Sequence, residues 1–228
     1  TLYSVQEILD TVQDFLNTVQ GAGRCHGAVP QPRYPVVVSN NRADVLRAAR
    51  GILTEHSLAD LSMRRLASEV GVRPNALYWH FPNKQSLLAA LADDILGDIG
   101  PTDPDQSWDG RLGAIAVGMR AALLAVPDSA EVVSSAWASG LGTRTVADDL
   151  TDVAISGGLT ARDACGVATA ICQLIIGLTI EEQTRAQMER LGVIGPSGRD
   201  FAAEFDDALG VLLDGARQRA HVDDARCS

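Results

Sequence analysis

The chain has 228 residues, of which 46% are hydrophobic and 21% are charged, so it is long enough and apolar enough to bury a substantial core. We expect no membrane-spanning segment, because no apolar run approaches the roughly 18 to 20 residues that cross a bilayer. The four cysteines lack the paired spacing of a zinc site or a disulfide framework. The composition therefore predicts a cytoplasmic protein with no membrane partner, no bound metal and no cofactor.

The net charge of −10 is unevenly distributed along the chain. Residues 1–92 contain nine basic and seven acidic side chains, whereas residues 93–228 contain ten basic and 22 acidic ones. Since nucleic acids attract positive charge, a nucleic-acid partner is expected to bind the first part of the chain.

The first segment, residues 1–20, places apolar side chains at alternating spacings of three and four, which predicts an amphipathic helix. Residues 21–41 contain three prolines and indicate a linker, in which only "YPVVV" has some strand character. A lone helix of this length needs a surface to cover its apolar face. It could dock a protein partner, block the DNA-binding part or pack on its own chain, and the sequence leaves these alternatives open.

From Arg42 onward the pattern predicts two helices joined by a tight turn. After a first helix that ends near residue 55, Ser62 is a suitable N-cap for a helix that stops at Gly71, a residue that suits a left-handed C-terminal cap. Pro74 can then occupy the first turn of the next helix. This layout is typical of a helix-turn-helix.

The remainder of the chain also has helical periodicity, and no stretch of useful length alternates as a strand would. The expected helices are 84–97, 108–125, 129–139, 143–156, 160–190 and 199–220. We therefore predict an all-α protein: an N-terminal helix and linker (1–41), a three-helix helix-turn-helix DNA-binding domain (42–88) and a larger helical ligand-binding and dimerisation domain (89–228).

The stretch "LSMRRLASEVGVRPNALYWHFPNKQSLLAAL", residues 61–91, closely resembles the DNA-binding domain of the tetracycline-repressor family of bacterial regulators. A fainter similarity continues to about residue 221. The last expected helix of this chain resembles the helix that helps to form the four-helix bundle of the dimer in that family. The resemblance implies a homodimeric repressor. Such a repressor leaves a palindromic double-stranded DNA operator when a small-molecule effector binds.

The resemblance also implies which residues contact DNA. Arg64, Arg73 and Asn75 have side chains able to hydrogen-bond base edges in the major groove. At the start of the recognition helix the tetracycline repressors have Glu-Gln-Pro-Thr where this chain has Arg73-Pro74-Asn75-Ala76, so we expect a different operator sequence. The positions that match phosphate contacts are Ser62, Tyr78, Trp79 and Lys84. An ordinary solvated face is the alternative for all of these residues, and His80 and Phe81 are expected to be structural.

The effector pocket is expected to differ from that of the tetracycline repressors. Val133 stands at the position of their metal-binding histidine, Ile115 at that of a tetracycline-binding asparagine, and Met119 at that of a pocket phenylalanine. These changes favour a different and largely apolar effector. The predicted pocket residues, for which plain core packing is the alternative, are Ile115, Met119, Val133, Trp137 and Ile176.

Enzymatic function has little support in the sequence. The chain has no His-Glu metal spacing, no nucleophile elbow and no phosphate-binding loop. We therefore expect no catalytic site. The other alternative is a DNA-binding regulator that a protein partner controls through the N-terminal helix, residues 1–20.

Overall fold

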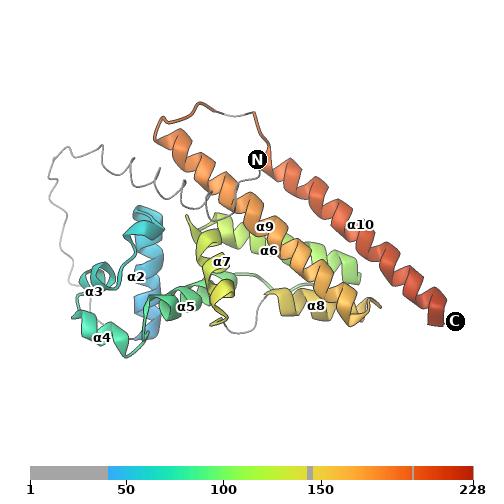
Figure 1. The fold of residues 1–228 in the computed structure, drawn as a ribbon, viewed down its shortest axis with the longest axis horizontal. Coiled ribbons are helices and arrows are strands. Elements are labelled where there is room, and N and C mark those ends of the chain that lie inside the picture. Colours follow the sequence, from blue (N-terminus) through green and yellow to red (C-terminus); the bar gives the residue numbers. More distant parts are fainter. Residues whose placement is uncertain (1–40, 143–145, 197, 228) are drawn as a thin grey trace, which may run out of the picture. The chain divides into compact units, whose positions relative to one another are not determined.

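In the computed structural model, residues 41–142, 146–196 and 198–227 are described, with side chains up to residue 220. Every regular element in these ranges is a helix (Figure 1), which confirms the predicted all-α class. They lie within one compact unit, Val38–Ser228. The predicted helix 1–20 and the "YPVVV" stretch lie outside the described residues, so both remain predictions.

The first helices form where the sequence predicted them. They are α2 (Arg42–Glu55), α3 (Met63–Val70) and α4 (Pro74–Tyr78), and a 3-10 helix that was not predicted, η1 (Leu58–Asp60), lies between α2 and α3. The side chain of Asn41 caps α2 by accepting a hydrogen bond from the Asp44 N–H at 2.9 Å. The buried face of α2 packs against α3 and α5, so this short module has its own apolar centre.

Helix α5 (Lys84–Leu96) is continuous across the predicted domain boundary at residue 88. Asn83 caps its first turn, since the Asn83 side chain accepts a hydrogen bond from the Ser86 N–H at 2.8 Å. Its buried residues include Leu87, Leu91 and Ile95, and the helix contacts α2, α6 and α7. It therefore connects the helix-turn-helix to the rest of the chain as one rigid element.

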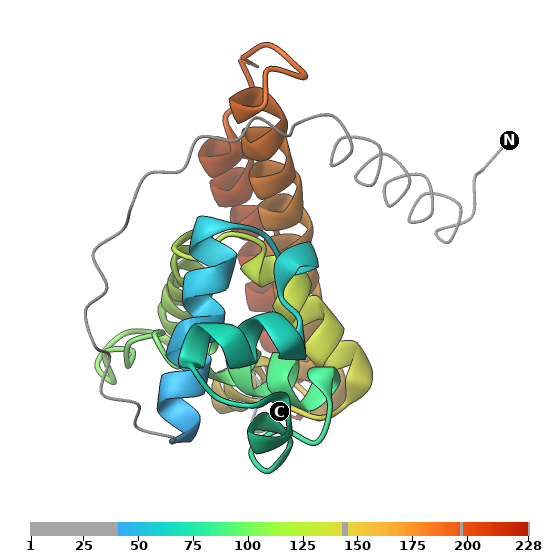
Figure 2. The same cartoon turned by 90° about the vertical axis from the view of Figure 1, so that its left-hand side faces the viewer.

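The five remaining helices form the larger part of the structure. They are α6 (Trp108–Leu124), α7 (Ser129–Ser139), α8 (Val146–Ser156), α9 (Ala161–Arg190) and α10 (Phe201–Cys227). The two long helices α9 and α10 lie side by side (Figures 1 and 2), and α6 contacts both of them as well as α8. The predicted end of the last helix, near residue 220, was wrong: the apolar periodicity stops there, but the backbone remains helical to Cys227.

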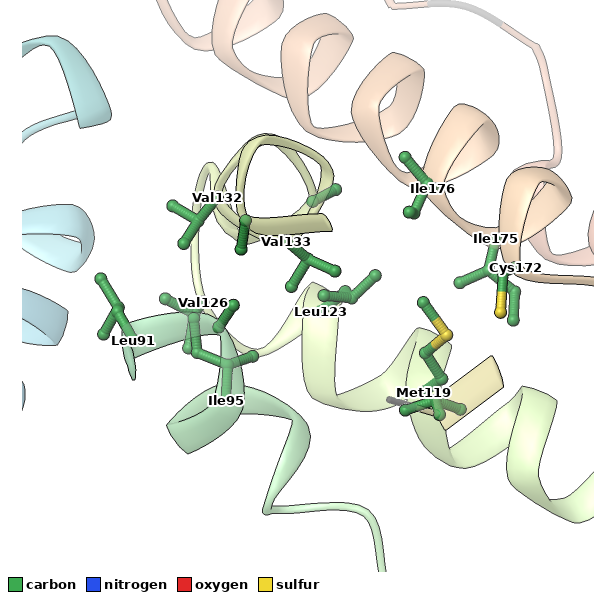
Figure 3. Close-up of a cluster of buried hydrophobic side chains, with 14 of the residues drawn as sticks. Leu91, Ile95, Met119, Leu123, Val126, Val132, Val133, Cys172, Ile175 and Ile176 are labelled. Carbon is green, nitrogen blue, oxygen red and sulfur yellow. The ribbon is translucent and has the colours of Figure 1, made fainter. Parts of the chain in front are cut away.

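The core of this part is an apolar cluster shared by α5, α6, α7 and α9. Figure 3 shows Met119 of α6 directed toward Cys172 and Ile175 of α9, with Leu123 beside Val133 of α7. All five side chains are buried. Complete burial of a large apolar side chain typically stabilises the fold by about 1.5–3 kcal/mol, so this cluster is a major source of stability.

One expectation about membranes needs correction. Helix α9 is long and apolar enough to cross a bilayer, although the sequence analysis expected no such run. Its contacts with α6, α7, α8 and α10 give a physical reason for the composition, because a helix that packs against neighbours on several sides needs apolar residues on several sides.

Candidate DNA-binding surface and ligand pocket

The turn between α3 and α4 is built around Gly71. This residue has φ 76° and ψ 28°, in the left-handed region that favours glycine, and its N–H bonds to the carbonyls of Ala67 and Ser68. Pro74 then occupies the first turn of α4, where the missing N–H of proline costs no helical hydrogen bond. Both local predictions are confirmed, and the two helices form a helix-turn-helix.

Two adjacent arginines, Arg64 and Arg65, lie at the start of α3 and have different surroundings. Ser62 is the N-cap, as predicted, and its hydroxyl oxygen accepts a hydrogen bond from the Arg65 N–H at 3.1 Å. The Arg65 guanidinium also pairs with Asp60 at 3.3 Å, whereas the side chain of Arg64 is exposed. Of the two arginines, Arg64 is therefore the more accessible for contact with a DNA groove.

Four consecutive rings, Tyr78 at the end of α4 and Trp79 to Phe81 directly after it, divide into an exposed pair and a more buried pair. Tyr78 is 47% exposed and Trp79 is 90% exposed, whereas Phe81 is buried and His80 is half-buried. The Arg42 guanidinium carbon lies 4.9 Å from the centre of the Phe81 ring and covers that ring through a cation–π contact. The structural role expected of Phe81 is confirmed, and DNA contact by Tyr78 and Trp79 stays a prediction.

The other predicted DNA-binding residues lie at helix starts. Arg73 is the N-cap residue of α4, and Asn75 follows one residue into the helix; both are exposed, while Ala76 is half-buried. Lys84 is the first residue of α5 and is also exposed. The module thus exposes amide, guanidinium, ammonium and aromatic groups. Proteins use groups of these kinds to contact base edges and phosphates of DNA.

A cavity of about 630 Å³ lies between the end of α5, α6 and α8. Of the five predicted pocket residues, Ile115 lines it. Met119, Val133 and Ile176 lie instead in the apolar cluster of Figure 3, and Trp137 is half-buried at its edge. Three of the predicted residues are therefore part of the apolar core, and one lines the cavity. Contact of any of them with an effector stays a prediction.

Sequence reasoning missed the polar lining of this cavity. Asp93 of α5, Arg111 of α6, and Asp149 and Asp152 of α8 all face it. Asp149 and Asp152 are three residues apart and so share one side of α8, a spacing that was visible in the sequence. It was overlooked because 22 acidic residues are spread over 93–228, where carboxylates normally indicate a solvated surface.

Metal-binding and thiol chemistry have no built site in the part of the chain that is described. There, no three His, Cys, Asp or Glu side chains come close enough to hold a metal ion. Cys165 and Cys172 are free, and burial raises the pKa of the Cys172 thiol to about 12, so this group stays protonated near neutral pH.

The fold and these surfaces define a class of protein: a helix-turn-helix module joined by one helix to a helical domain with a cavity. The family "Bacterial regulatory proteins, tetR family" matches residues 45–91. "Tetracyclin repressor-like, C-terminal domain" matches residues 100–194. Tetracycline repressor protein class A from transposon 1721 of Escherichia coli is 30% identical over 202 residues, covering 78% of this chain and 91% of that protein.

Solved structures agree with these matches. BioQ of Mycobacterium smegmatis has a TM-score of 0.73 and 38% identity, over 78% of this chain and 98% of its own. BioQ with its double-stranded DNA operator has a TM-score of 0.67 and 36% identity, with the same coverage. A tetracycline repressor variant from Acinetobacter baumannii AYE in complex with minocycline has a TM-score of 0.65 and 27% identity, over 78% and 97%.

The chain belongs to the tetracycline-repressor family of bacterial regulatory proteins. It is a DNA-binding transcriptional regulator and not an enzyme, which confirms both expectations. The first match ends at residue 91 and the second begins at residue 100, so residues 92–99 lie between them; this segment includes the end of α5 and part of the cavity wall.

Proposed function

We propose that the protein is a homodimeric, ligand-responsive repressor that binds a palindromic operator and leaves it when a small effector binds. The observation that carries the proposal is the exposed surface of α4: Arg73 and Asn75 at its start, and Trp79, 90% exposed, at its end. Exposing the apolar surface of such a large aromatic side chain to water is unfavourable, and a partner that covers it removes this surface from water. A DNA backbone is a partner that also suits the neighbouring arginines.

Base and backbone contacts then divide among the predicted residues. Arg64, Arg73 and Asn75 read base edges, each good bidentate contact contributing about 1–3 kcal/mol of discrimination. Ser62, Tyr78, Trp79 and Lys84 hold phosphates and fix the orientation of the helix. Support comes from BioQ, which resembles this chain and whose structure contains its DNA operator.

The dimer uses the outer faces of α9 and α10. On α9 the residues Cys165, Thr169, Gln173 and Gly177 recur every fourth position on one side and are all exposed. On α10 the side chain of Val211 is 72% exposed. Two such helix pairs related by a two-fold axis form a four-helix bundle, and this symmetry matches a palindromic operator.

The effector binds in the cavity between α5, α6 and α8. Ile115 and Val153 offer it apolar contact, and Arg111 and Thr102 can orient its polar groups. The three carboxylates of the lining favour an effector that carries more polar groups than the largely apolar one expected from the sequence. The structure of a related repressor with minocycline supports a small-molecule effector in this family. A regulator of genomic DNA acts in the cytoplasm.

Selection of bound fragments from genomic DNA, followed by titration of a selected fragment, tests the proposal. Asn75→Ala should relax the preference at one base pair, whereas Trp79→Ala should weaken binding to all sequences alike. Arg64→Ala should lose selectivity, and Arg47→Ala, an exposed arginine paired with Asp44 on α2, is the matched control. A purified protein that selects no sequence would contradict the proposed function.

A further inference from the structure

The first helix of the DNA-binding module is tied to the end of α5 by one arginine and two carboxylates. Nη1 of Arg50 in α2 lies 3.0 Å from Oδ2 of Asp94, and Nη2 lies 2.6 Å from Oδ2 of Asp98. The two acids are four residues apart, about one helical turn, so a single planar guanidinium bridges them. We call this arrangement the Arg50 fork.

The same turn of chain also forms a wall of the cavity. Asp93, Leu96, Gly97, Ile99 and Gly100 line the cavity, and the two acids of the fork are interleaved with them. Residues 93–100 therefore have one side on the cavity and another on α2. Any molecule that fills the cavity touches the segment that Arg50 grips.

The end of this segment has a tighter hydrogen-bond pattern than the helix before it. Helix α5 ends at Leu96, and the N–H groups of Asp98 and Ile99 bond at 3.2 Å to the carbonyls of Ile95 and Leu96, three residues back. Such i to i+3 turns are common where a helix ends and can rearrange without disturbing the packed part of the helix. The geometry thus provides an element that can change while the core of α5 stays in place.

We propose that Arg50 is the positioning residue that transmits cavity occupancy to the DNA-binding helices. This inference rests on the proposed function. A ligand against Gly97 and Gly100 shifts the turn that follows α5, and the fork carries α2 with it. The guanidinium holds Asp98 of that turn as well as Asp94 of α5, so it fixes the direction of the shift. Partly exposed ion pairs add little to stability, so the fork selects a position of α2 more than it holds the module together.

The test needs no knowledge of the natural effector, because a side chain can fill the cavity. Gly100 lines it, and a Cβ added there meets nothing within 4 Å, so Gly100→Trp is a suitable filler. The probe is an operator fragment selected from genomic DNA, and the readout is its dissociation constant. We expect Gly100→Trp to weaken binding about tenfold, as typical allosteric couplings do.

The double-mutant cycle decides whether Arg50 carries this effect. In an Arg50→Gln background, Gly100→Trp should change operator affinity less than about twofold. In an Arg47→Gln background it should keep its full effect, because Arg47 lies on the same helix and pairs with Asp44 of that helix. Thermal unfolding followed by helical circular dichroism verifies that each variant is folded.

Two outcomes would overturn the inference while leaving the proposed function intact. One is an equal loss of affinity from Gly100→Trp with and without Arg50. The other is no loss from either Gly100→Trp or a second filler, Thr102→Trp, since the cavity would then not be coupled to DNA binding. Failure of the unmodified protein to select any DNA would instead reject the proposed function.

Discussion

The carboxylate of Asp128 accepts a hydrogen bond from the Leu58 N–H, with 2.7 Å between Oδ2 and nitrogen. This bond joins the turn between α6 and α7 to the first residue of η1 in the DNA-binding module. Among the residues that the structure describes, Asp128 is the one non-glycine residue with positive φ, at 59°. A left-handed backbone at such a residue costs about 1–3 kcal/mol, which the surrounding turn must offset.

The turn is held from α9. Nε2 of Gln183 donates hydrogen bonds to the carbonyls of Leu123 and Val126, both at 2.9 Å, and the buried Ser129 hydroxyl donates to Leu123 at 2.5 Å. These side-chain bonds add to the backbone hydrogen bonds that the carbonyls of Leu123 and Val126 accept from the N–H groups of Val126 and Ser129, both at 3.3 Å. Asp128 therefore connects the long helix α9 to the DNA-binding module through a few fixed bonds.

Asp128→Gly separates the hydrogen bond from the backbone conformation. Glycine adopts positive φ without strain, so global stability should change by less than about 1 kcal/mol while the acceptor is lost. Amide hydrogen exchange at Leu58 should then accelerate about tenfold. The His56 amide, bonded to Ile52 at 2.9 Å, is the internal control. Unchanged exchange at Leu58 would show that the contact does not hold η1.

Gly157→Ala should destabilise the fold. An added Cβ would lie 2.2 Å from Cδ2 of Trp108, so the indole ring at the start of α6 must move. Overpacking of this kind typically costs about 1–3 kcal/mol, measurable by denaturant unfolding. Gly51→Ala in α2 is the control: a Cβ there meets nothing within 4 Å, and alanine should stabilise the helix by up to about 1 kcal/mol.

Val211→Asp should break the proposed dimer. Burying an unpaired carboxylate at the centre of a helix interface is costly. We therefore expect the dissociation constant of the dimer to increase at least about a hundredfold. Val117→Asp is the matched control, because Val117 is a similarly exposed valine, at 53%, on α6. Sedimentation equilibrium checks both variants. A dimer of unchanged affinity in the Val211 variant would place the interface elsewhere.

The contact between α6 and α10 should weaken in acid. A hydrogen bond from Ser107, together with the nearby Arg217 guanidinium, lowers the pKa of Asp109 below its ordinary 3.8, and Nη2 of Arg217 lies 2.6 Å from Oδ2. A carboxyl with a depressed folded pKa stabilises the fold above its unfolded pKa and loses this effect as pH falls through the folded one.

Asp109→Asn should therefore lower the free energy of unfolding at neutral pH, and the difference from the unmodified protein should shrink as pH falls below about 3.8. Asp214→Asn tests specificity, because Asp214 pairs with the same arginine but is largely exposed. It should have little effect at any pH. A pH-independent difference for Asp109→Asn would contradict the ionic explanation.

Local features of the DNA-binding module were predictable residue by residue. Ser62 caps α3, Gly71 takes the left-handed position, and Pro74 opens α4, since each depends on backbone preferences over a few residues. The different roles of the four rings were implied by the family resemblance, and the structure buries Phe81 while it leaves Tyr78 and Trp79 exposed. The Asn83 cap of α5 was not identified, although its position before a leucine-rich helix was a usable signal.

The cavity was predictable only in part. Ile115 lines it, but Met119 and Val133 are core, because the crossing of α6 with α7 and α9 decides which apolar residues meet. Periodicity marks the buried side of a helix and does not identify the neighbour it meets. The carboxylates of α8 reach the cavity for the same reason.

By itself the sequence determined most of the helices, the two caps of α3, the helix-turn-helix and the family. These follow from contacts between residues three or four apart and from a specific motif. Only the tertiary structure decided the Arg50 fork, the Asp128 contact with Leu58 and the polar wall of the cavity. Each joins residues at least 44 positions apart or on different helices, so it depends on how the helices cross, which no local preference specifies.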